Sequence, residues 1–363
     1  GIEGSLASAC AHGGIYSADP KLVKIDFSSS VNPLGAPKKA IRVIKKGAGE
    51  LAPVYPDPEC TELKKAIARH AGVKTSQLAV GNGAVEIIYW FARLYAKKRV
   101  VVPAPTFCEY ELAAQKAGAE VTFVPLADFR LGADAVIKSA KGADAIFLCN
   151  PNNPTGLLST AEARQVIESV DHSTKILLDE CFIELVDRPD ANTLVRMTDR
   201  HDNLVVLRSL TKSFGMAGLR VGYSVSSPAI ADALSSQKVP WNVNGLAQAA
   251  GVAALGDDDS HLQRARALVK KERAFLHDRI SKIKSLVPLA SDSNYFMIQL
   301  KNGSNNNSAK FRDQLLRKTG VLVRDCSTFT GMGSQHVRVA VRTHKENVLL
   351  VRALEAMDNG KAR

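Results

Sequence analysis

The strongest chemical signal in the sequence is a lysine flanked by residues that can hold a phosphate. Lys212 has a serine, Ser209, three residues before it and an arginine, Arg220, eight residues after it. A lysine amine can form an imine with an aldehyde, and serine and arginine side chains can bind a phosphate beside it. A lysine in a surface turn would give the same local pattern, so the assignment depends on other segments.

An aspartate at the end of an apolar run provides a second signal. Asp179 follows Leu177 and Leu178 and precedes Lys212 by 33 residues. A carboxylate in this position could keep the ring nitrogen of a heterocyclic cofactor protonated, and the ring would then act as an electron sink. An isolated aspartate at a strand end is more often a cap or a turn residue.

Two further loops have residues suited to holding a cofactor. Residues 150–156 read NPNNPTG, where two prolines stiffen the loop and Asn153 can donate a hydrogen bond to a ring oxygen. Residues 81–85 read GNGAV, where glycine allows close approach of the backbone and a helix start offers free N–H groups to a phosphate. The second loop lacks the G-K-[ST] of a Walker loop and the final glycine of G-x-G-x-x-G. A plain turn and a plain helix entry are the competing interpretations.

These residues fall between short apolar runs that alternate with helical segments, which indicates an α/β fold with a mainly parallel sheet. Because ligands bind outside the carboxyl ends of such strands, residues that follow the strands are well placed for a site. We expect strands at Leu78–Val80, Arg99–Val102, Glu120–Val124, Asp144–Leu148, Lys175–Leu178, Leu204–Leu207 and Arg220–Val225. We expect helices at Glu62–Ala71, Val85–Tyr95, Glu109–Ala117, Thr160–Ser169 and Ala229–Ser236.

After about residue 245 the pattern changes to that of a smaller α+β unit. A long helical stretch is expected over Leu246–Ile283. Strands are expected at Asn294–Leu300, Leu322–Arg324 and Val337–Val341. We therefore predict a large domain over residues 46–271 and a small domain that combines residues 1–45 with 272–363.

Taken together, the four segments resemble fold-type-I pyridoxal-phosphate (PLP) enzymes of aminotransferase class I/II, and the resemblance covers almost the whole chain. It implies the aspartate-aminotransferase fold and PLP as cofactor. Lys212 would be the Schiff-base lysine, Asp179 the partner of the pyridine nitrogen, and Asn153 a donor to the 3-oxygen of the ring. The residues implied at the cofactor phosphate are Ser209, Arg220 and the backbone of Gly83, Ala84 and Val85.

The resemblance also implies an aromatic contact and a second subunit. Phe107 matches the aromatic residue that stacks on the cofactor ring, although core packing is an equally common role for a phenylalanine. Tyr55 matches a tyrosine that reaches the cofactor phosphate of the neighbouring subunit, which implies a homodimer with composite sites. Phe182 stands where many relatives have tyrosine, so one donor to the 3-oxygen is missing and Asn153 would act without it.

Four segments and one single residue resemble the threonine-phosphate decarboxylase branch of this family: His12-Gly13-Gly14, residues 25–35, residues 207–212, residues 240–244, and Phe182 in place of tyrosine. This branch implies decarboxylation of O-phospho-L-threonine to (R)-1-amino-2-propanol phosphate in cobalamin biosynthesis. Histidinol-phosphate aminotransferases share the fold and a phosphorylated substrate and are the alternative, and phosphoserine is a second substrate to consider. The residues implied at the substrate are His12, Asn32, Asn153, Arg324 and Arg338.

Charge and composition narrow the other function classes. The net charge is +12, but the basic residues are dispersed, so we expect no nucleic-acid partner and only a field that attracts an anionic substrate. No apolar run approaches the ~18 residues of a membrane span, and the first residues lack a secretory pattern, so we expect a cytoplasmic protein without a membrane partner. A non-catalytic regulatory protein of the same fold is the remaining class, and the presence of both Lys212 and Asp179 argues against it.

The six cysteines show neither a C-x-x-C pair nor zinc spacing with histidine. We therefore expect no metal site. Cysteines scattered in this way are typical of reduced, mostly buried residues, so we expect no disulfide.

Overall fold

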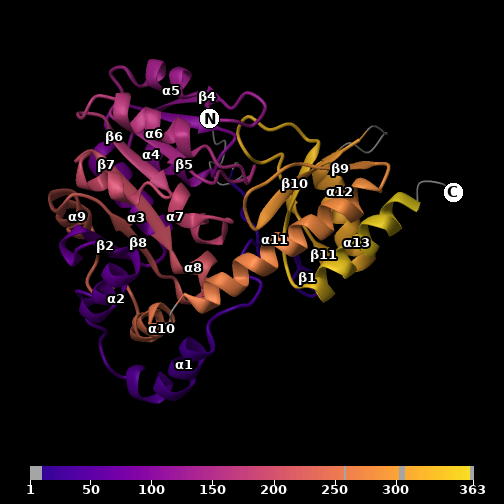
Figure 1. The fold of residues 1–363 in the computed structure, drawn as a ribbon, viewed down its shortest axis with the longest axis horizontal. Helices are drawn as coiled ribbons and strands as arrows, with labels where there is room; N and C mark the ends of the chain where they lie inside the picture. The colour runs from indigo at the N-terminus through magenta and orange to yellow at the C-terminus, as the bar shows by residue number, and fades with distance from the viewer. Residues whose placement is uncertain (1–9, 257–258, 302–306, 360–363) are drawn as a thin grey trace, which may run out of the picture.

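The computed structural model describes residues 10–256, 259–301 and 307–359. The ribbon forms two lobes, one around a large sheet and one around a smaller sheet (Figure 1). Helix α11 (Ser260–Ser281) runs from the large lobe to the small one. Among the described residues, none of the helices is long and apolar enough to span a membrane.

The large lobe is built on a seven-stranded sheet whose strands are parallel except at one position. Its order is β2 (Leu78–Gly81), β8 (Gly222–Val225), β7 (Leu204–Ser209), β6 (Lys175–Asp179), β5 (Ala145–Cys149), β3 (Arg99–Ala104) and β4 (Glu120–Pro125). Strand β8 is antiparallel to both β2 and β7, and the remaining pairs are parallel. This arrangement confirms the predicted α/β class with a mainly parallel sheet.

Successive residues of each central strand enter two different cores, because side chains alternate across a sheet. In β5, Phe147 packs into one core, while Ile146 and Leu148 pack into the core on the opposite face. One core includes α1 (Lys38–Leu51), α2 (Thr61–Ala71), α5 (Ala133–Ala140), α6 (Thr160–Ser169) and α10 (Gly245–Leu255). The other includes α3 (Ala84–Tyr95), α4 (Glu109–Lys116) and α9 (Pro228–Ser235). Strands that are apolar on both faces follow from this double coverage.

The small lobe has its own antiparallel sheet and its own core. The sheet order is β12 (Arg324–Asp325), β13 (His336–Ala340), β10 (Tyr295–Leu300) and β9 (Leu286–Pro288). Helices α11, α12 (Ser308–Thr319) and α13 (His344–Asn359) accompany it, and β1 (Ile25–Asp26) pairs in parallel with β11 (Val321–Leu322).

Two short helices, α7 (Pro189–Asn192) and α8 (Leu210–Ser213), lie in the large lobe.

Several predicted elements need correction. The stretch expected over Leu246–Ile283 is two helices, because α10 ends at Leu255 and α11 begins after Asp259, which has a left-handed φ of 64°. The strand expected over Leu322–Arg324 is divided between β11 and β12. Helices α1 and α5 were not predicted at all.

The predicted domain boundaries fall inside helices. Residue 45 lies within α1, which packs beside α10 in the large lobe, and residue 271 lies within α11. Since α11 reaches both lobes, it offers no natural break at that point (Figure 1). The division at residues 45 and 271 stays a prediction.

Candidate active site

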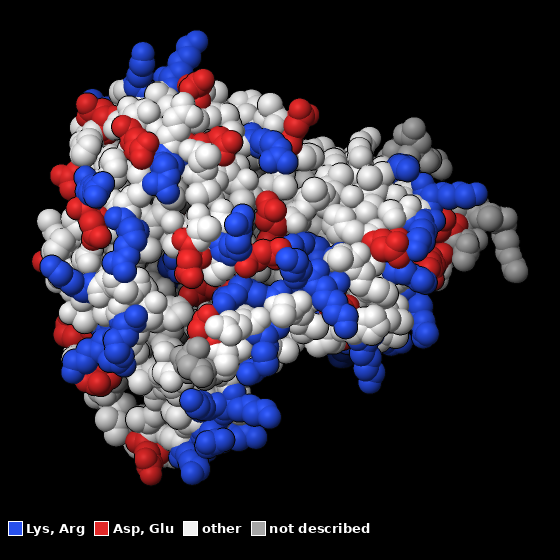
Figure 2. Space-filling view, in the orientation of Figure 1, with Lys and Arg blue, Asp and Glu red and all other residues white. Residues whose placement is uncertain are grey.

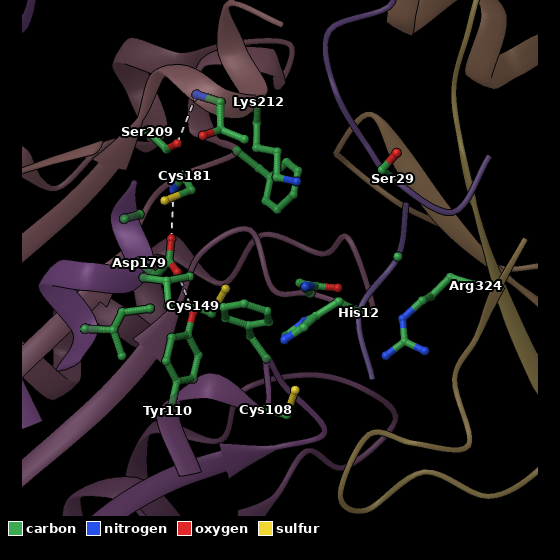
Figure 3. A pocket seen from close by; sticks show the side chains of 18 of the residues that line it. His12, Ser29, Cys108, Tyr110, Cys149, Asp179, Cys181, Ser209, Lys212 and Arg324 are labelled. Carbon is green, nitrogen blue, oxygen red and sulfur yellow. Dashed lines mark hydrogen bonds between the residues drawn. The ribbon is translucent and has the colours of Figure 1, made fainter. Parts of the chain in front are cut away.

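A cavity of about 250 Å³ lies at the carboxyl ends of the central strands (Figure 3). Asn153, Asp179 and Lys212 follow three neighbouring strands, β5, β6 and β7, so the parallel register brings them to the same edge of the sheet. The predicted site residues that line the cavity are His12, Ala84, Val85, Phe107, Asn153, Asp179, Ser209, Lys212, Arg220, Arg324 and Arg338.

Asp179 is buried at the end of β6 and held by two hydrogen bonds. The Tyr110 hydroxyl donates to its Oδ2 at 2.6 Å, and the Cys181 backbone N–H donates to its Oδ1 at 2.9 Å. Burial raises the pKa of Asp179, while these donors and the charge of Lys212 oppose the rise. An ionised carboxylate at this position would be stabilised by a cationic partner, such as the protonated nitrogen of a pyridine ring.

Lys212 lies in α8, the short helix that follows β7. Ser209 caps this helix, since its Oγ accepts a hydrogen bond from Thr211 N at 3.0 Å. Burial lowers the pKa of Lys212 to about 8, and the positive charges of Arg338 and Arg220 act in the same direction. A substantial neutral fraction makes the amine a competent nucleophile and proton carrier near neutral pH.

The loop before α3, Arg220 and the start of α8 meet at one corner of the cavity. Gly83 has a φ of 84°, which favours glycine, and a Cβ there would lie 2.3 Å from Arg220 Nη2 and would displace the guanidinium. Arg220 Nη1 lies 3.4 Å from the Thr211 hydroxyl oxygen. The backbone N–H groups at the start of α3, the hydroxyls and the guanidinium together form a cradle suited to a phosphate.

Aromatic rings form the wall next to Asp179. Phe107 lines the cavity and meets Tyr110 edge-on, with ring centroids 5.6 Å apart. Tyr110 stacks on Phe147, which fixes the direction of its hydroxyl toward Asp179. Phe182 lies on another side, with its ring centroid 5.7 Å from Lys212 Nζ. The flat space between aromatic side chains suits a planar heterocycle.

Two arginines reach the cavity from the small lobe. Arg338 Nη1 donates to Asn153 Oδ1, and its Nη2 donates to the Ser28 carbonyl at 2.8 Å. Arg324 donates to the carbonyl of Ala11 and to the Thr328 hydroxyl. Burial lowers the pKa of both guanidinium groups, and proximity to Arg338 helps to bring that of Arg324 to about 10.

Three predicted site residues are absent from the cavity lining, and one of them, Gly83, acts at the cradle described above. Asn32 was expected to line the pocket. Instead, its Nδ2 donates to the Ser213 carbonyl at 2.7 Å and its Oδ1 accepts from Leu34 N at 2.9 Å, so it positions the turn that carries Lys212. Tyr55 is 78% exposed and stacks against Trp241, so any contact with a cofactor would have to be in another subunit.

Sequence reasoning missed several residues at the cavity. Tyr110, the donor to Asp179, follows Phe107 by three residues at the start of α4, and this position after a strand end was a usable signal. Thr211 directly precedes Lys212 and lies between Ser209 and Lys212 in the sequence. The other lining residues that were not assigned to the site are Ala11, Gly13, Ser28, Ser29, Ile88, Cys108, Cys149, Cys181, Phe182 and Phe329.

The expectation that all cysteines are reduced is wrong. Cys10 and Cys108 form a disulfide, with their Cα atoms 5.6 Å apart and their positions 98 residues apart in the sequence. The folded chain brings the N-terminal segment onto the start of α4, and spacing alone could not reveal that contact. The other four cysteines are free.

The donor set fits PLP. The cavity offers a carboxylate for a pyridine nitrogen, an amine for an aldehyde and a cradle for a phosphate. Gly83 leaves space for Arg220 at that cradle, and among the described residues no guanidinium pairs with the buried Asp179. Asn153 keeps its amide N–H groups available because Arg338 engages its oxygen.

Comparison with known proteins agrees with this geometry. Residues 23–354 match the family "Aminotransferase class I and II". A candidate threonine-phosphate decarboxylase of Caldanaerobacter subterraneus subsp. tengcongensis is 35% identical, over 98% of this chain and 96% of the relative. A histidinol-phosphate aminotransferase of Symbiobacterium thermophilum is 36% identical, over 92% of this chain and 90% of the relative. The crystal structure of the histidinol-phosphate aminotransferase from Clostridium acetobutylicum is 29% identical with a TM-score of 0.84, covering 92% of this chain and 99% of that one.

The family match covers most of the sequence, and relatives above 30% identity cover nearly the whole chain. Enzymes of this family depend on PLP, which is the cofactor that the cavity fits. The chain is therefore a PLP-dependent enzyme that belongs to the aminotransferase class I and II family.

Proposed function

We propose that the protein decarboxylates O-phospho-L-threonine to CO₂ and (R)-1-amino-2-propanol phosphate, as in cobalamin biosynthesis. The observation that supports an anionic substrate is the pair Arg324 and Arg338. Both are buried beside the cavity, and the hydrogen-bond partners of both among the described residues are carbonyl, hydroxyl and amide oxygens, with no carboxylate.

Two buried guanidinium groups without a counter-ion are costly, and each raises the electrostatic cost of the other. Arg338 also has a buried Nε without a hydrogen-bond partner in the described part of the chain. A substrate that carries both a phosphate and a carboxylate would supply the missing negative charge and acceptors. His12 lines the same side of the cavity and could add a further contact to the phosphate (Figure 3).

The remaining residues have separate tasks. PLP, when bound, accepts the electron pair of the bond that breaks at the substrate α-carbon. Asp179 would keep the ring nitrogen protonated, and the cradle of Ser209, Arg220 and the α3 start would fix the phosphate of the cofactor. Lys212 would hold the cofactor in the resting enzyme and return a proton to the α-carbon after CO₂ has left.

Reaction specificity would depend on which bond at the α-carbon the residues of the cavity orient for cleavage. Arginines that oriented the carboxylate for loss would favour decarboxylation, and the same residues would serve transamination if they oriented the Cα–H bond instead. Support for decarboxylation comes from the His12-Gly13-Gly14 segment, from Phe182, and from the candidate threonine-phosphate decarboxylase that is 35% identical over 98% of this chain. Transamination of histidinol phosphate is the alternative, supported by the relatives that act on it.

The enzyme is further proposed to be a homodimer. Tyr55 and Trp241 are large side chains that are 78% and 48% exposed and stack on each other. Exposed aromatic pairs of this kind are typical of residues covered in an assembly. Tyr55 would then reach the cofactor phosphate of the neighbouring subunit.

The deciding experiment supplies the PLP-loaded enzyme with O-phospho-L-threonine and measures CO₂ release together with the phosphorylated product by ³¹P NMR. We expect one CO₂ for each substrate consumed, with or without a 2-oxo acid. Parallel reactions with O-phospho-L-serine compare the two substrates, and Lys212→Ala serves as the inactive control. Brisk conversion of histidinol phosphate with a 2-oxo acid, without CO₂ from phosphothreonine, would establish the aminotransferase instead.

A further inference from the structure

The disulfide joins two segments that both line the cavity. Cys108 lies directly before α4, lines the cavity and is next to Phe107. Cys10 precedes Ala11, His12 and Gly13, which line the cavity from the N-terminal segment. The Cα–Cα distance of 5.6 Å is within the ordinary range for a disulfide, so the backbones are already placed for the bond.

The N-terminal segment, residues 10–14, crosses between the two lobes. On the large-lobe side, His12 Nε2 lies 2.7 Å from Glu109 Oε1. On the small-lobe side, the Ala11 carbonyl accepts from Arg324, and Gly14 N donates to Ser28 Oγ at 2.8 Å. In Figure 3, His12 lies between Arg324 on one side and the wall that carries Cys108 on the other. This segment therefore connects the cofactor wall with the anion-binding arginines.

We propose that Cys10 and Cys108 form a reversible disulfide that fastens the N-terminal segment to the cavity wall, so that their redox state sets the affinity for the phosphorylated substrate. The disulfide keeps His12 in place, so no conformational entropy of this segment is lost when the substrate binds. After reduction, the hold on the large lobe depends on the contact between His12 and Glu109. The His12 side chain is 51% exposed, and contacts of such exposed charges are weak.

The remaining thiols are poorly suited to compete in exchange. Burial raises the pKa of Cys60 to about 11 and that of Cys326 to about 12, and it also raises the pKa of Cys149 and Cys181. With these raised pKa values, the four thiols stay protonated at neutral pH. Because the thiolate is the reactive form, they react poorly in exchange. Thiol–disulfide exchange should thus be concentrated at the pair beside the cavity.

The oxidant that the proposal requires is a small-molecule disulfide. The thiolate of one cysteine attacks a sulfur of this molecule, which forms a mixed disulfide and releases one small thiolate. The thiolate of the second cysteine then attacks the protein-bound sulfur, which forms the Cys10–Cys108 bond and releases the second small thiolate. Two protein thiols are oxidised, one small disulfide is reduced to two thiols, and the two protons pass to the released thiolates.

The test uses the full-length PLP-loaded enzyme, treated with oxidised glutathione or with dithiothreitol and then freed of reagent. Intact mass and a non-reducing peptide map report the bond, and hydrogen–deuterium exchange of residues 10–14 reports the segment. Affinity is followed through the absorbance of the bound cofactor, with O-phospho-L-threonine and separately with inorganic phosphate. The exchange readout needs no substrate, so it remains valid if phosphothreonine is not the substrate.

We expect the oxidised enzyme to weigh two hydrogen atoms less, to protect residues 10–14 and to bind about tenfold more tightly, since the reduced segment must be ordered on binding. Cys10→Ser and Cys108→Ser should both behave as the reduced enzyme under either treatment. Cys60→Ala, at a buried cysteine outside the cavity, should keep the full response.

Three results would overturn the proposal. The first is a mass that shows free thiols at both positions after oxidation. The second is a bond that forms without any change in segment protection or affinity. The third concerns Cys10, His12 and Cys108, whose ligand atoms lie within 4.8 Å of one another. A tight one-to-one Zn²⁺ complex of the reduced enzyme, lost in Cys10→Ser, would identify a metal site in place of the redox pair.

Discussion

Replacing Tyr110 by phenylalanine would test how the protein keeps Asp179 ionised. The hydroxyl of Tyr110 donates to Asp179 Oδ2 at 2.6 Å, and both residues are buried. The substitution removes one oxygen and leaves the ring, which stacks on Phe147, in place. Because Tyr110 acts through Asp179, it is a positioning residue whose loss should change catalysis without changing substrate contacts.

The expected size follows from the length and burial of this bond. A distance of 2.6 Å falls in the short range of charge-assisted O–H···O⁻ bonds, which contribute about 1.5–3 kcal/mol. Without this donor to the charged form, the pKa of Asp179 should rise further above its ordinary value. A carboxylate that is harder to ionise supports a protonated ring less well, so kcat should fall about tenfold or more.

The assay compares kcat, KM and the pH dependence of the cofactor absorbance for the wild-type enzyme and Tyr110→Phe. KM for the phosphorylated substrate should stay within about twofold, because the change lies in the cofactor wall and not at the arginines. Tyr223→Phe is the matched control, since Tyr223 is buried and its hydroxyl has no hydrogen-bond partner among the described residues. The reasoning fails if Tyr110→Phe matches the wild type, or if both substitutions reduce kcat equally.

Three further predictions follow from the same geometry. Lys212→Ala should abolish fixation of the cofactor by borohydride. In the wild-type enzyme, the rate of PLP capture should rise with pH and level off above about 8 instead of near 10.5, because only the neutral amine of Lys212 reacts. Stopped-flow absorbance measures this rate. Arg338→Ala should raise KM for the phosphorylated substrate by roughly 10- to 150-fold through loss of a charge-assisted pair, whereas Arg342→Ala, which breaks an ion pair with Glu346 outside the cavity, should leave KM unchanged. The enzyme should sediment as a dimer, and Tyr55→Phe should weaken PLP retention; a fully active monomer would contradict this.

The sequence was informative wherever function and local structure use the same residues. Apolar runs at the strands predicted the parallel sheet, because buried strands are apolar on both faces. Lys212, Asp179 and Asn153 could be placed at one edge because each follows such a run, and the structure brings them to one cavity. The glycine requirement at Gly83 could also be anticipated from the loop pattern.

Contacts between distant segments were the part that the sequence did not predict. The Ser213 carbonyl that Asn32 binds lies 181 residues away, and Cys108 and Glu109 lie 98 and 99 residues from Cys10, so nothing near Asn32 or Cys10 in the sequence indicates these contacts. Asn32 was therefore assigned to the substrate pocket, whereas its amide holds the Ser213 carbonyl. The predicted dispersal of basic residues agrees with Figure 2, where Lys and Arg are interspersed with Asp and Glu over the face shown, with a denser basic group over α1.

A hydrogen bond joins a residue that we propose for the substrate anion to one that we propose for the cofactor. Arg338 donates to the amide oxygen of Asn153, so the amide nitrogen of Asn153 is directed away from the arginine. If that nitrogen donates to the 3-oxygen of the ring, any movement of Arg338 toward a substrate carboxylate also changes a donor to the ring. Phe182 supplies no hydroxyl that could compensate. A difference of about 1.4 kcal/mol between two transition states gives a tenfold preference for one reaction. A shift of this one contact is therefore large enough to influence whether CO₂ or a proton leaves first.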